Sequence, residues 1–287
     1  MRTLKCALLA VCVTAPAQAE IHARAVAADV SRAEPAAAWW TTAPVETVSL
    51  MAQPMVTPRP KETLTPHVAV QAATDGKWIA FRFHWSDPEK SEAGRLGEFS
   101  DGCAMMFPVL SNDAPPPIFM GAKDNPVHIF HWRAQYQRDR DHGKPTIRDL
   151  YPNVSIDIYP GEFADQGSIG VIPPEKREQF SPGMAEGNPQ SYAKTGVDEI
   201  YAEGFSTSQV QAGGGSWGMG VWENGAWTVV IARELKREGG SVLTAPGKTF
   251  AGFAVWQGGS GEVGSRKDVT MVWTPVVIDA APLGASR

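Results

Sequence analysis

Short alternations of apolar and polar residues recur along the chain and predict β-strands. In residues 77–85 (KWIAFRFHW), every second residue from Ile79 to Trp85 is apolar, so these side chains would share one face of a strand. Asp75-Gly76 and Asn224-Gly225 are dipeptides that tight hairpin turns prefer. Further strands are expected at residues 47–51, 67–72, 126–133, 226–233, 249–256 and 268–278.

The number and spacing of these strands predict an antiparallel β-sandwich. At least six short segments follow one another without the alternation of strands and helices that accompanies a parallel sheet. Gly (28 residues) and Pro (23 residues) are spread along the chain, which leaves few runs that could form long helices. We therefore expect one all-β domain over residues 20–287, a length that a single large β domain can reach.

The strand pattern fails between residues 135 and 197. This stretch is rich in charges, Pro and Gly (RDRDHGKP, IPPEKREQ, SPGMAEGNPQ). Loops of this length are uncommon in compact domains and usually cover a site or contact a partner. We expect a long loop insertion here, and a frayed tail over residues 280–287.

The first nineteen residues have the layout of a secretory signal peptide. Arg2 and Lys5 give a basic start, residues 6–13 are apolar, and Ala17-Gln18-Ala19 matches a cleavage site. The apolar run is much shorter than the roughly 20 residues that span a bilayer. Cleavage before Glu20 would deliver the mature chain to the periplasm without a membrane span.

Removal of this leader changes the charge and the cysteine count. The formal net charge moves from −5 to −7, with 24 basic against 31 acidic residues, and Cys103 is the one cysteine left. A single cysteine forms no internal disulfide, so a core or a bound ligand must stabilise the fold. The acidic balance and the lack of a basic run argue against a nucleic-acid partner.

The sequence offers no convincing catalytic signature. The G-x-S-x-G spacing occurs once, at residues 214–218, but its glycines precede Ser216-Trp217 rather than a helical pattern, so we read them as a flexible turn. There is no H-E-x-x-H or P-loop, and C-x-x-C-H, which attaches c-type haem, is also missing. Residues with thioether or imidazole groups do gather in two segments that follow one another, DGCAMMFP with Met105 and Met106, and FMGAKDNPVHIFHWRA with Met120, His128 and His131. Consecutive elements are usually neighbours, and thioethers suit copper(I) or haem iron.

These segments belong to a longer series in which the chain resembles a known family. The series runs DGKWIAFRFHWSD, FSDGCAMMFP, FMGAKDNPVHIFHWRA, DLYPNVSIDIYP, EIYAEGFST, ENGAWTVVIAREL, FAGFAVWQGG and GSRKDVTMVW. In this order the pieces resemble the haem-b-binding γ subunits of ethylbenzene dehydrogenase, dimethylsulfide dehydrogenase, and selenate and chlorate reductases. The resemblance covers nearly the whole mature chain.

The resemblance implies a non-covalent haem b in a pocket of the sandwich, with a methionine and a lysine as axial iron ligands. Met120 matches the methionine best, with Met106 as the rival. Lys248, just before the FAGFAVW strand, is the favoured lysine, and Lys267 and Lys194 are the other candidates. A ligating lysine must be neutral, which burial against an apolar macrocycle favours. The expected shell around the cofactor is Phe119, Phe130, Trp132, Phe253 and Trp256.

The same resemblance implies a function in electron transfer. With both axial positions filled, the iron would bind neither substrate nor oxygen readily. The partners would be a molybdopterin catalytic subunit, an iron–sulfur subunit and a soluble cytochrome c, and the chain itself would be non-catalytic.

Two other classes of function fit parts of the sequence. Ten tryptophans, among them Trp39, Trp40, Trp217 and Trp222, would suit a carbohydrate-binding module, which has no use for a Met and Lys pair. The methionines and His131 would alternatively suit a periplasmic copper carrier, which would bind copper(I) and show no haem spectrum.

Overall fold

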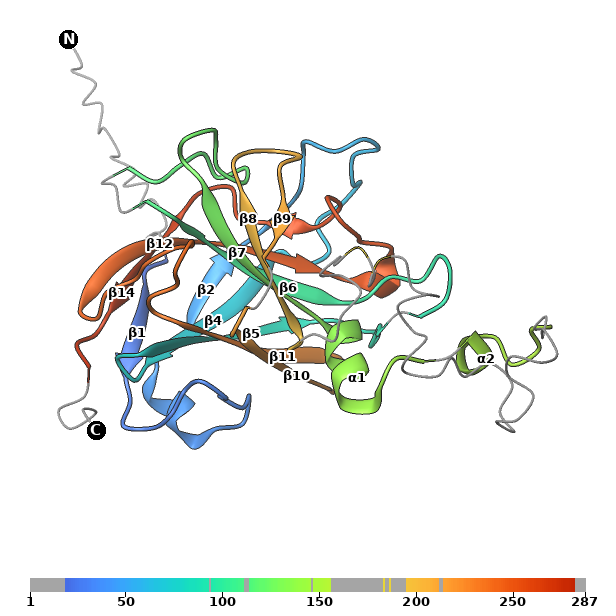
Figure 1. Cartoon of the computed structure of the whole chain (residues 1–287), viewed down its shortest axis with the longest axis horizontal. Coiled ribbons are helices and arrows are strands. Elements are labelled where there is room, and N and C mark those ends of the chain that lie inside the picture. Colours follow the sequence, from blue (N-terminus) through green and yellow to red (C-terminus); the bar gives the residue numbers. More distant parts are fainter. Residues whose placement is uncertain are drawn as a thin grey trace, which may run out of the picture.

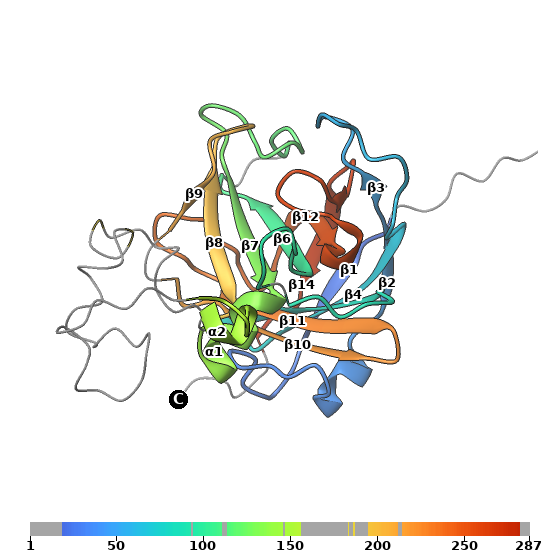
Figure 2. The same ribbon diagram turned by 90° about the vertical axis from the view of Figure 1, so that its right-hand side faces the viewer.

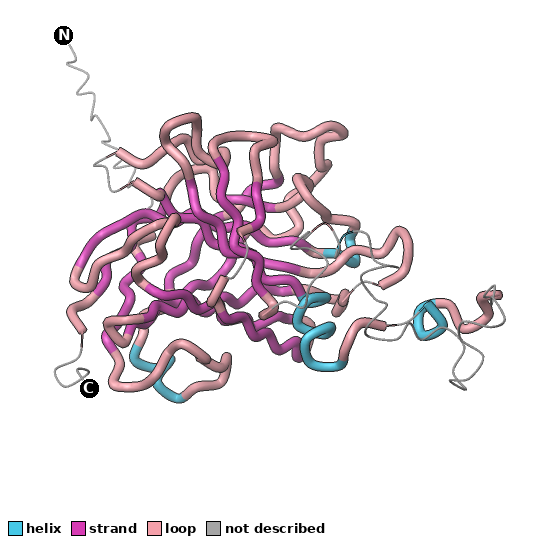
Figure 3. Tube along the Cα trace, in the orientation of Figure 1, coloured by secondary structure: helices cyan, strands magenta, loops and turns pink. Residues whose placement is uncertain are grey.

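The computed structural model describes residues 19–92, 94–110, 114–145, 147–155, 195–211 and 214–281, together with positions 183 and 186. Strands dominate these residues, and helices are few and short (Figure 3). The predicted leader up to residue 18, most of the long insertion, Lys194 and the last six residues lie outside this part of the chain. Within the described residues, no helix is long and apolar enough to cross a bilayer.

The fold is a β-sandwich made from one continuous path of strands (Figures 1 and 2). The first layer contains, in spatial order, β10 (Trp217–Glu223), β11 (Ala226–Glu234), β5 (Trp78–Ser86), β4 (His67–Thr74), β1 (Ile21–Ala25) and β14 (Thr274–Ile278), with β2 (Glu46–Ser49) on β4. The second contains β12 (Gly247–Trp256), β6 (Gly102–Pro108), β7 (Val127–Arg133), β8 (Val197–Ala202) and β9 (Gln209–Val210), with β13 (Asp268–Val269) on β12 and β3 (Met51–Ala52) on β13.

Strand β12 joins the two layers. Its first half, Gly247 to Ala251, pairs with β14, whereas its second half, Gly252 to Trp256, pairs with β6. A strand that changes layers must bend, and glycine permits such a bend because it has no side chain to crowd the corner. Gly252 therefore stands where the sheet turns into the second layer.

The main hydrophobic core lies between the layers. It is formed by alternate side chains of both sheets, including Phe81 and Phe83 of β5, Phe130 and Trp132 of β7, and Phe253 of β12. The outer face of the first layer is covered by the N-terminal segment, which buries Val30 and Trp40 against it and contains a short 3-10 helix (Ala38–Thr42). The outer face of the second layer has no such cover in the described residues, and it carries the site described below.

The predicted strands are largely confirmed, but two predicted segments are divided, and β1, β6, β8 and β10 were not predicted. Residues 268–278 form two separate strands, β13 and β14, in different layers. Residues 47–51 likewise divide between β2 and β3, which belong to different layers. The sheet is also mixed rather than purely antiparallel, because β1 pairs in parallel with both β4 and β14. Two helices, α1 (Ala134–His142) and α2 (Ile147–Leu150), form at the start of the predicted insertion.

Candidate haem site

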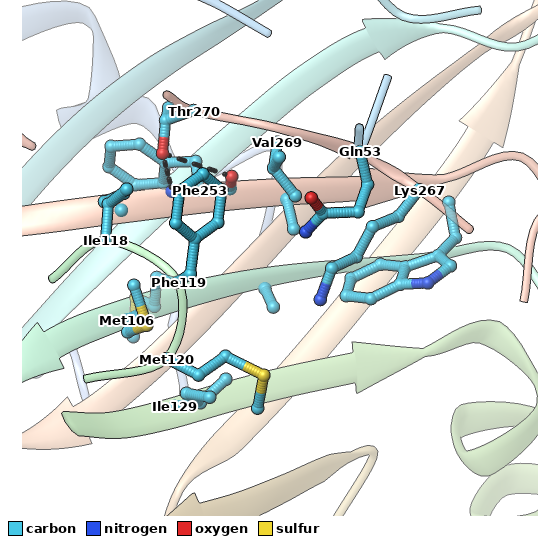
Figure 4. A pocket seen from close by; sticks show the side chains of 15 residues that line it. Gln53, Met106, Ile118, Phe119, Met120, Ile129, Phe253, Lys267, Val269 and Thr270 are labelled. Atoms are coloured by element: carbon cyan, nitrogen blue, oxygen red, sulfur yellow. Dashed lines mark hydrogen bonds between the residues drawn. The ribbon is translucent and has the colours of Figure 1, made fainter. Parts of the chain in front are cut away.

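A cavity of about 480 Å³, its open mouth included, lies on the outer face of the second layer. Its floor is formed by β6, β7 and β12, and its walls by the loop before β7 and the segments around β3 and β13 (Figure 4). The lining residues are Gln53, Ala104, Met105, Met106, Ile118, Phe119, Met120, Ile129, Gly252, Phe253, Ala254, Trp256, Lys267, Val269 and Thr270.

The floor of the cavity is made of small residues. Gly252 and Ala254 of β12 lie beside Met106 and Ala104 of β6 in the ladder, and side chains at these positions share the outer face because strand residues alternate. A Cβ atom added at Gly252 would lie 3.1 Å from Met106 Cε and 3.2 Å from Ile118 Cδ1. The side chains of Met106 and Ile118 thus lie close over the bare backbone at Gly252, and even a methyl group at this position would crowd them.

The side chain of Met120 extends into this cavity, and its backbone has an unfavourable conformation. Its φ is +68°, a left-handed conformation that is uncommon for residues other than glycine, asparagine and aspartate. Three backbone hydrogen bonds hold the loop: Met120 N–H donates to Ile118 O (3.0 Å), Gly121 N–H to Pro117 O (3.0 Å) and Gly204 N–H to Met120 O (2.8 Å). Strain of this kind often marks functional positions.

Met106 also reaches the cavity, but from a regular strand. It lies in the middle of β6, paired with Gly252 on one side and Ile129 on the other. Its side chain packs in the small apolar cluster that includes Ile118 and Met120. Its neighbour Met105 faces the opposite way, into the main core, where it is fully buried. Two thioethers, those of Met106 and Met120, are therefore available to a ligand.

Lys267 supplies an amine at the other side of the cavity. It immediately precedes β13, and its carbonyl oxygen accepts a hydrogen bond from Gln53 N–H (2.9 Å). Its Nζ atom lies 4.7 Å from the centroid of the Trp256 ring, and in Figure 4 Lys267 and Met120 extend into the cavity from opposite sides. Desolvation by the surrounding groups lowers the pKa of Lys267 to about 8.

The structure does not bring Lys248 to the cavity. This lysine is exposed on β12, opposite Val277 of β14. It precedes Gly252 by four residues, which amounts to about 13 Å along a strand. Lys194 lies outside the described residues.

The expected aromatic shell is divided between the cavity and the core. Phe119 and Trp256 line the cavity, and Trp256 also stacks on His131 at a centroid distance of 4.3 Å. Phe130 and Trp132 point into the main core instead. The ring of Phe253 likewise packs on Phe81 and Phe83 in the core, so this residue borders the cavity through its backbone.

Sequence reasoning missed several lining residues. Ile118, Ile129 and Val269 are apolar and appear in the sequence as ordinary core residues, and no local signal separates them from the core. Gln53 lies in a segment with no strand partner close by in the sequence. It reaches the cavity because β3 pairs with β13, more than two hundred residues later.

These residues fit a haem. The lining combines apolar walls, two thioethers and one amine with a lowered pKa, and it contains no carboxylate. Thioethers are accepted haem ligands, and a neutral amine offers a lone pair. The lack of acidic side chains also means that nothing in the lining would repel a ligand that carries carboxylates.

Comparisons of sequences found one family model and two relatives that match most of the chain. A sequence model of the family described as ethylbenzene dehydrogenase matches residues 37–268. A protein of Haloferax mediterranei, named "Putative respiratory nitrate reductase heme subunit ORF7", is 24% identical over 262 residues, which cover 90% of this chain and 73% of the relative. Chlorate reductase subunit gamma of Ideonella dechloratans is 26% identical over 245 residues, which cover 84% of this chain and 77% of the relative.

Solved structures with a similar arrangement of strands are carbohydrate-binding proteins of very low sequence identity. A family 9 carbohydrate-binding module from Caldicellulosiruptor kristjanssonii, solved with glucose, has a TM-score of 0.42 at 9% identity and covers 93% of this chain and 100% of its own. A protein from Bacteroides uniformis, described as "a putative carbohydrate-binding protein", has a TM-score of 0.45 at 7% identity, with 92% and 100% covered.

Proposed function

The chain belongs to the ethylbenzene dehydrogenase family, and we propose that it is the haem-binding, electron-transfer subunit of a molybdenum oxidoreductase. Its two relatives are named as a haem subunit of a nitrate reductase and as the gamma subunit of a chlorate reductase. The observation that carries the proposal is the cavity, where a thioether and an amine extend from opposite sides over a floor of small residues.

In this proposal the cofactor is a non-covalent haem b, because the sequence has no C-x-x-C-H attachment motif. Met120 and Lys267 would be the axial ligands. Met120 is preferred to Met106 because its loop is fixed in a strained conformation that aims the side chain into the cavity. Lys267 replaces Lys248 as the preferred lysine because it lines the cavity.

The lowered pKa of Lys267 bears directly on iron binding. Only the neutral amine can coordinate, and each pKa unit above the ambient pH adds about 1.4 kcal/mol to the free energy of deprotonation. At pH 7 a lysine with its ordinary pKa would need about 5 kcal/mol, whereas a pKa of about 8 reduces this to about 1.4 kcal/mol. Desolvation therefore removes most of the obstacle to ligation.

A haem held by both Met120 and Lys267 would supply one-electron transfer, since no coordination position is left for a substrate. The chain would then pass electrons between an iron–sulfur subunit of the complex and a soluble cytochrome c, with the substrate chemistry on a separate molybdopterin subunit. The signal peptide predicted from the sequence would place the complex in the periplasm.

The test is the visible spectrum of the mature chain, expressed in a bacterial periplasm with haem supplied. A sharp low-spin Soret band, with α and β bands on reduction and a pigment that acid acetone extracts, is the expected result. Met120→Ala and Lys267→Ala should produce a high-spin spectrum or lose the haem. The matched variants Met106→Ala and Lys248→Ala should keep the low-spin spectrum.

Two outcomes would contradict the proposal in different ways. A folded protein that stays colourless after addition of hemin would exclude haem binding, and titrations with copper(I) and with oligosaccharides would then follow. A low-spin spectrum that survives in Lys267→Ala but is lost in Lys248→Ala would keep the haem and reverse the lysine assignment. One that survives in Met120→Ala but is lost in Met106→Ala would reverse the methionine assignment.

A further inference from the structure

Gln53 lies at the mouth of the cavity, where one hydrogen bond orients its side-chain amide. The Met55 N–H group donates a hydrogen bond to Gln53 Oε1 (3.3 Å). A backbone N–H can only donate, so this contact identifies which end of the amide is the oxygen. The amide nitrogen is then directed into the cavity, on the side where Lys267 lies (Figure 4).

The backbone of Gln53 is tied to the segment that carries Lys267. Residues Met51 and Ala52 form the β3 ladder with β13, and Gln53 N–H continues it by donating to Lys267 O (2.9 Å). The backbones of Gln53 and Lys267 are therefore held in fixed register, so both side chains start from neighbouring positions at the cavity.

Among the described residues, the amide nitrogen of Gln53 has no hydrogen-bond acceptor, whereas the hydroxyl of Thr270 and the indole N–H of Trp256 are already paired. Trp256 Nε1 donates to Gly264 O (2.9 Å). Thr270 Oγ1 accepts a hydrogen bond from Phe253 N–H (3.0 Å) and donates to Phe253 O (3.4 Å). With Lys267 assigned to the iron, Gln53 provides the remaining donor of the cavity.

The polarity of the cavity is thus uneven. Met106, Ile118 and Phe119 form an apolar end, and Gln53 lies apart from them, half-buried at the mouth. A haem has the same division, with an edge of methyl and vinyl groups and an opposite edge that carries two propionate carboxylates. An amide N–H to a carboxylate is a charge-assisted hydrogen bond, stronger than one between neutral groups.

We propose that Gln53 is the residue that recognises a free carboxylate of the porphyrin, and that it thereby fixes the orientation of the cofactor in the cavity. This inference rests on the proposed haem-binding function. It makes the site selective for porphyrins with unesterified propionates, held with the apolar edge against Met106 and Ile118 and a carboxylate at the mouth.

The experiment compares dissociation rates of three iron porphyrins from the mature chain, with apomyoglobin as the acceptor. They are haem, iron mesoporphyrin (carboxylates kept, vinyl groups reduced) and the dimethyl ester of haem (carboxylates blocked). The variants are Gln53→Leu, which removes the donor, and Gln53→Glu, which keeps the size and adds a repelling charge. Gln209→Leu, an exposed glutamine on β9, is the matched control.

Gln53→Leu should release haem and iron mesoporphyrin about tenfold faster than the unaltered chain, which corresponds to about 1.4 kcal/mol, and Gln53→Glu should release them faster still. All four proteins should release the dimethyl ester at rates within about twofold of one another, and Gln209→Leu should match the unaltered chain throughout. Circular dichroism before loading checks that the variants are folded.

The inference is overturned if Gln53→Leu releases haem at the unaltered rate, or if its faster release persists with the dimethyl ester, since the amide would then act by packing and not on a carboxylate. An unaltered chain that binds no porphyrin would instead refute the proposed function itself. The two failures therefore give different results.

Discussion

Glu262 is a buried carboxyl group in an environment that disfavours its charge. Burial raises its pKa from 4.5 to about 7, the charges of Asp268 and Asp87 act in the same direction, and the hydrogen bond from Gln257 N–H (2.8 Å) opposes them. The folded state thus binds the proton more tightly than the unfolded state. This contribution to stability is complete below pH 4.5 and is lost as the pH rises through about 7.

The size of the effect follows from the shift in pKa. Each pKa unit corresponds to about 1.4 kcal/mol, so a shift of roughly 2.5 units makes the folded protein about 3 kcal/mol less stable at pH 8 than it would be with a neutral group at this position. Glu262→Gln has the same shape, can still accept the hydrogen bond from Gln257, and carries no charge. We expect it to raise the free energy of unfolding by about 2 to 3 kcal/mol at pH 8 and by little at pH 5.

Urea unfolding of both proteins at pH 5 and pH 8, in the same cofactor state, measures this difference. Titrating groups that do not interact with Glu262 cancel when the two proteins are compared, whereas Asp87 and Asp268, which repel its charge, add to the difference in the same direction. Glu223→Gln, at an exposed position at the end of β10, is the control and should change nothing. Equal stabilities of Glu262→Gln and the unaltered chain at pH 8 would refute the argument from burial.

Three further predictions concern other parts of the molecule. Gly252→Ala should narrow the floor of the cavity and weaken haem binding in the spectrum while circular dichroism shows an intact fold, because the added Cβ would lie 3.1 Å from Met106 Cε and 3.2 Å from Ile118 Cδ1, the ends of flexible side chains. Burial alone would raise the pKa of Glu199, but the His128 ring, whose Nε2 lies 3.6 Å from Glu199 Oε2, the two hydrogen bonds from Ser216 and the charge of Arg237 lower it to about 2. Glu199→Gln should therefore cost about 3 kcal/mol at pH 7, and the difference should vanish as urea titrations are taken from pH 4.5 towards pH 2. Burial raises the pKa of the Cys103 thiol, so Ellman's reagent should react with it only after unfolding, and reaction in the native protein would contradict this placement.

The sequence predicts the strands well because local alternation determines them. The pattern at residues 77–85 corresponds to β5 (Trp78–Ser86), and residues 226–233 correspond to β11 (Ala226–Glu234). Strand β6 was harder to predict because GCAMMFP has apolar residues on both faces, one towards the core and the other towards the cavity. The parallel position of β1 between β4 and β14 depends on pairing across the whole chain, which no local pattern encodes.

The candidate site could be predicted in its chemistry more fully than in its geometry. Met120 was identified in the sequence, and the structure places it in the cavity wall. Among the lysines, Lys248 was favoured over Lys267, and no local pattern could correct that choice, because both lie close to the start of a strand and both follow turn residues. The structure distinguishes them because β12 bends at Gly252, so that its first half, which contains Lys248, pairs with β14 and lies away from the cavity.

Met120 and Met106 offer the same thioether but differ in how the fold supports them. Met106 is held by an ordinary strand ladder, in which its conformation is unstrained. Met120 occupies a left-handed conformation that is roughly 1–2 kcal/mol unfavourable for an L-residue and that glycine would adopt without strain. The hydrogen bonds from Gly204 and within the loop fix that conformation before any ligand arrives. An iron-ligating side chain that is already oriented loses less entropy on binding than a mobile one. The strain at Met120 therefore has a physical role if it keeps the side chain pointing into the cavity before the cofactor binds.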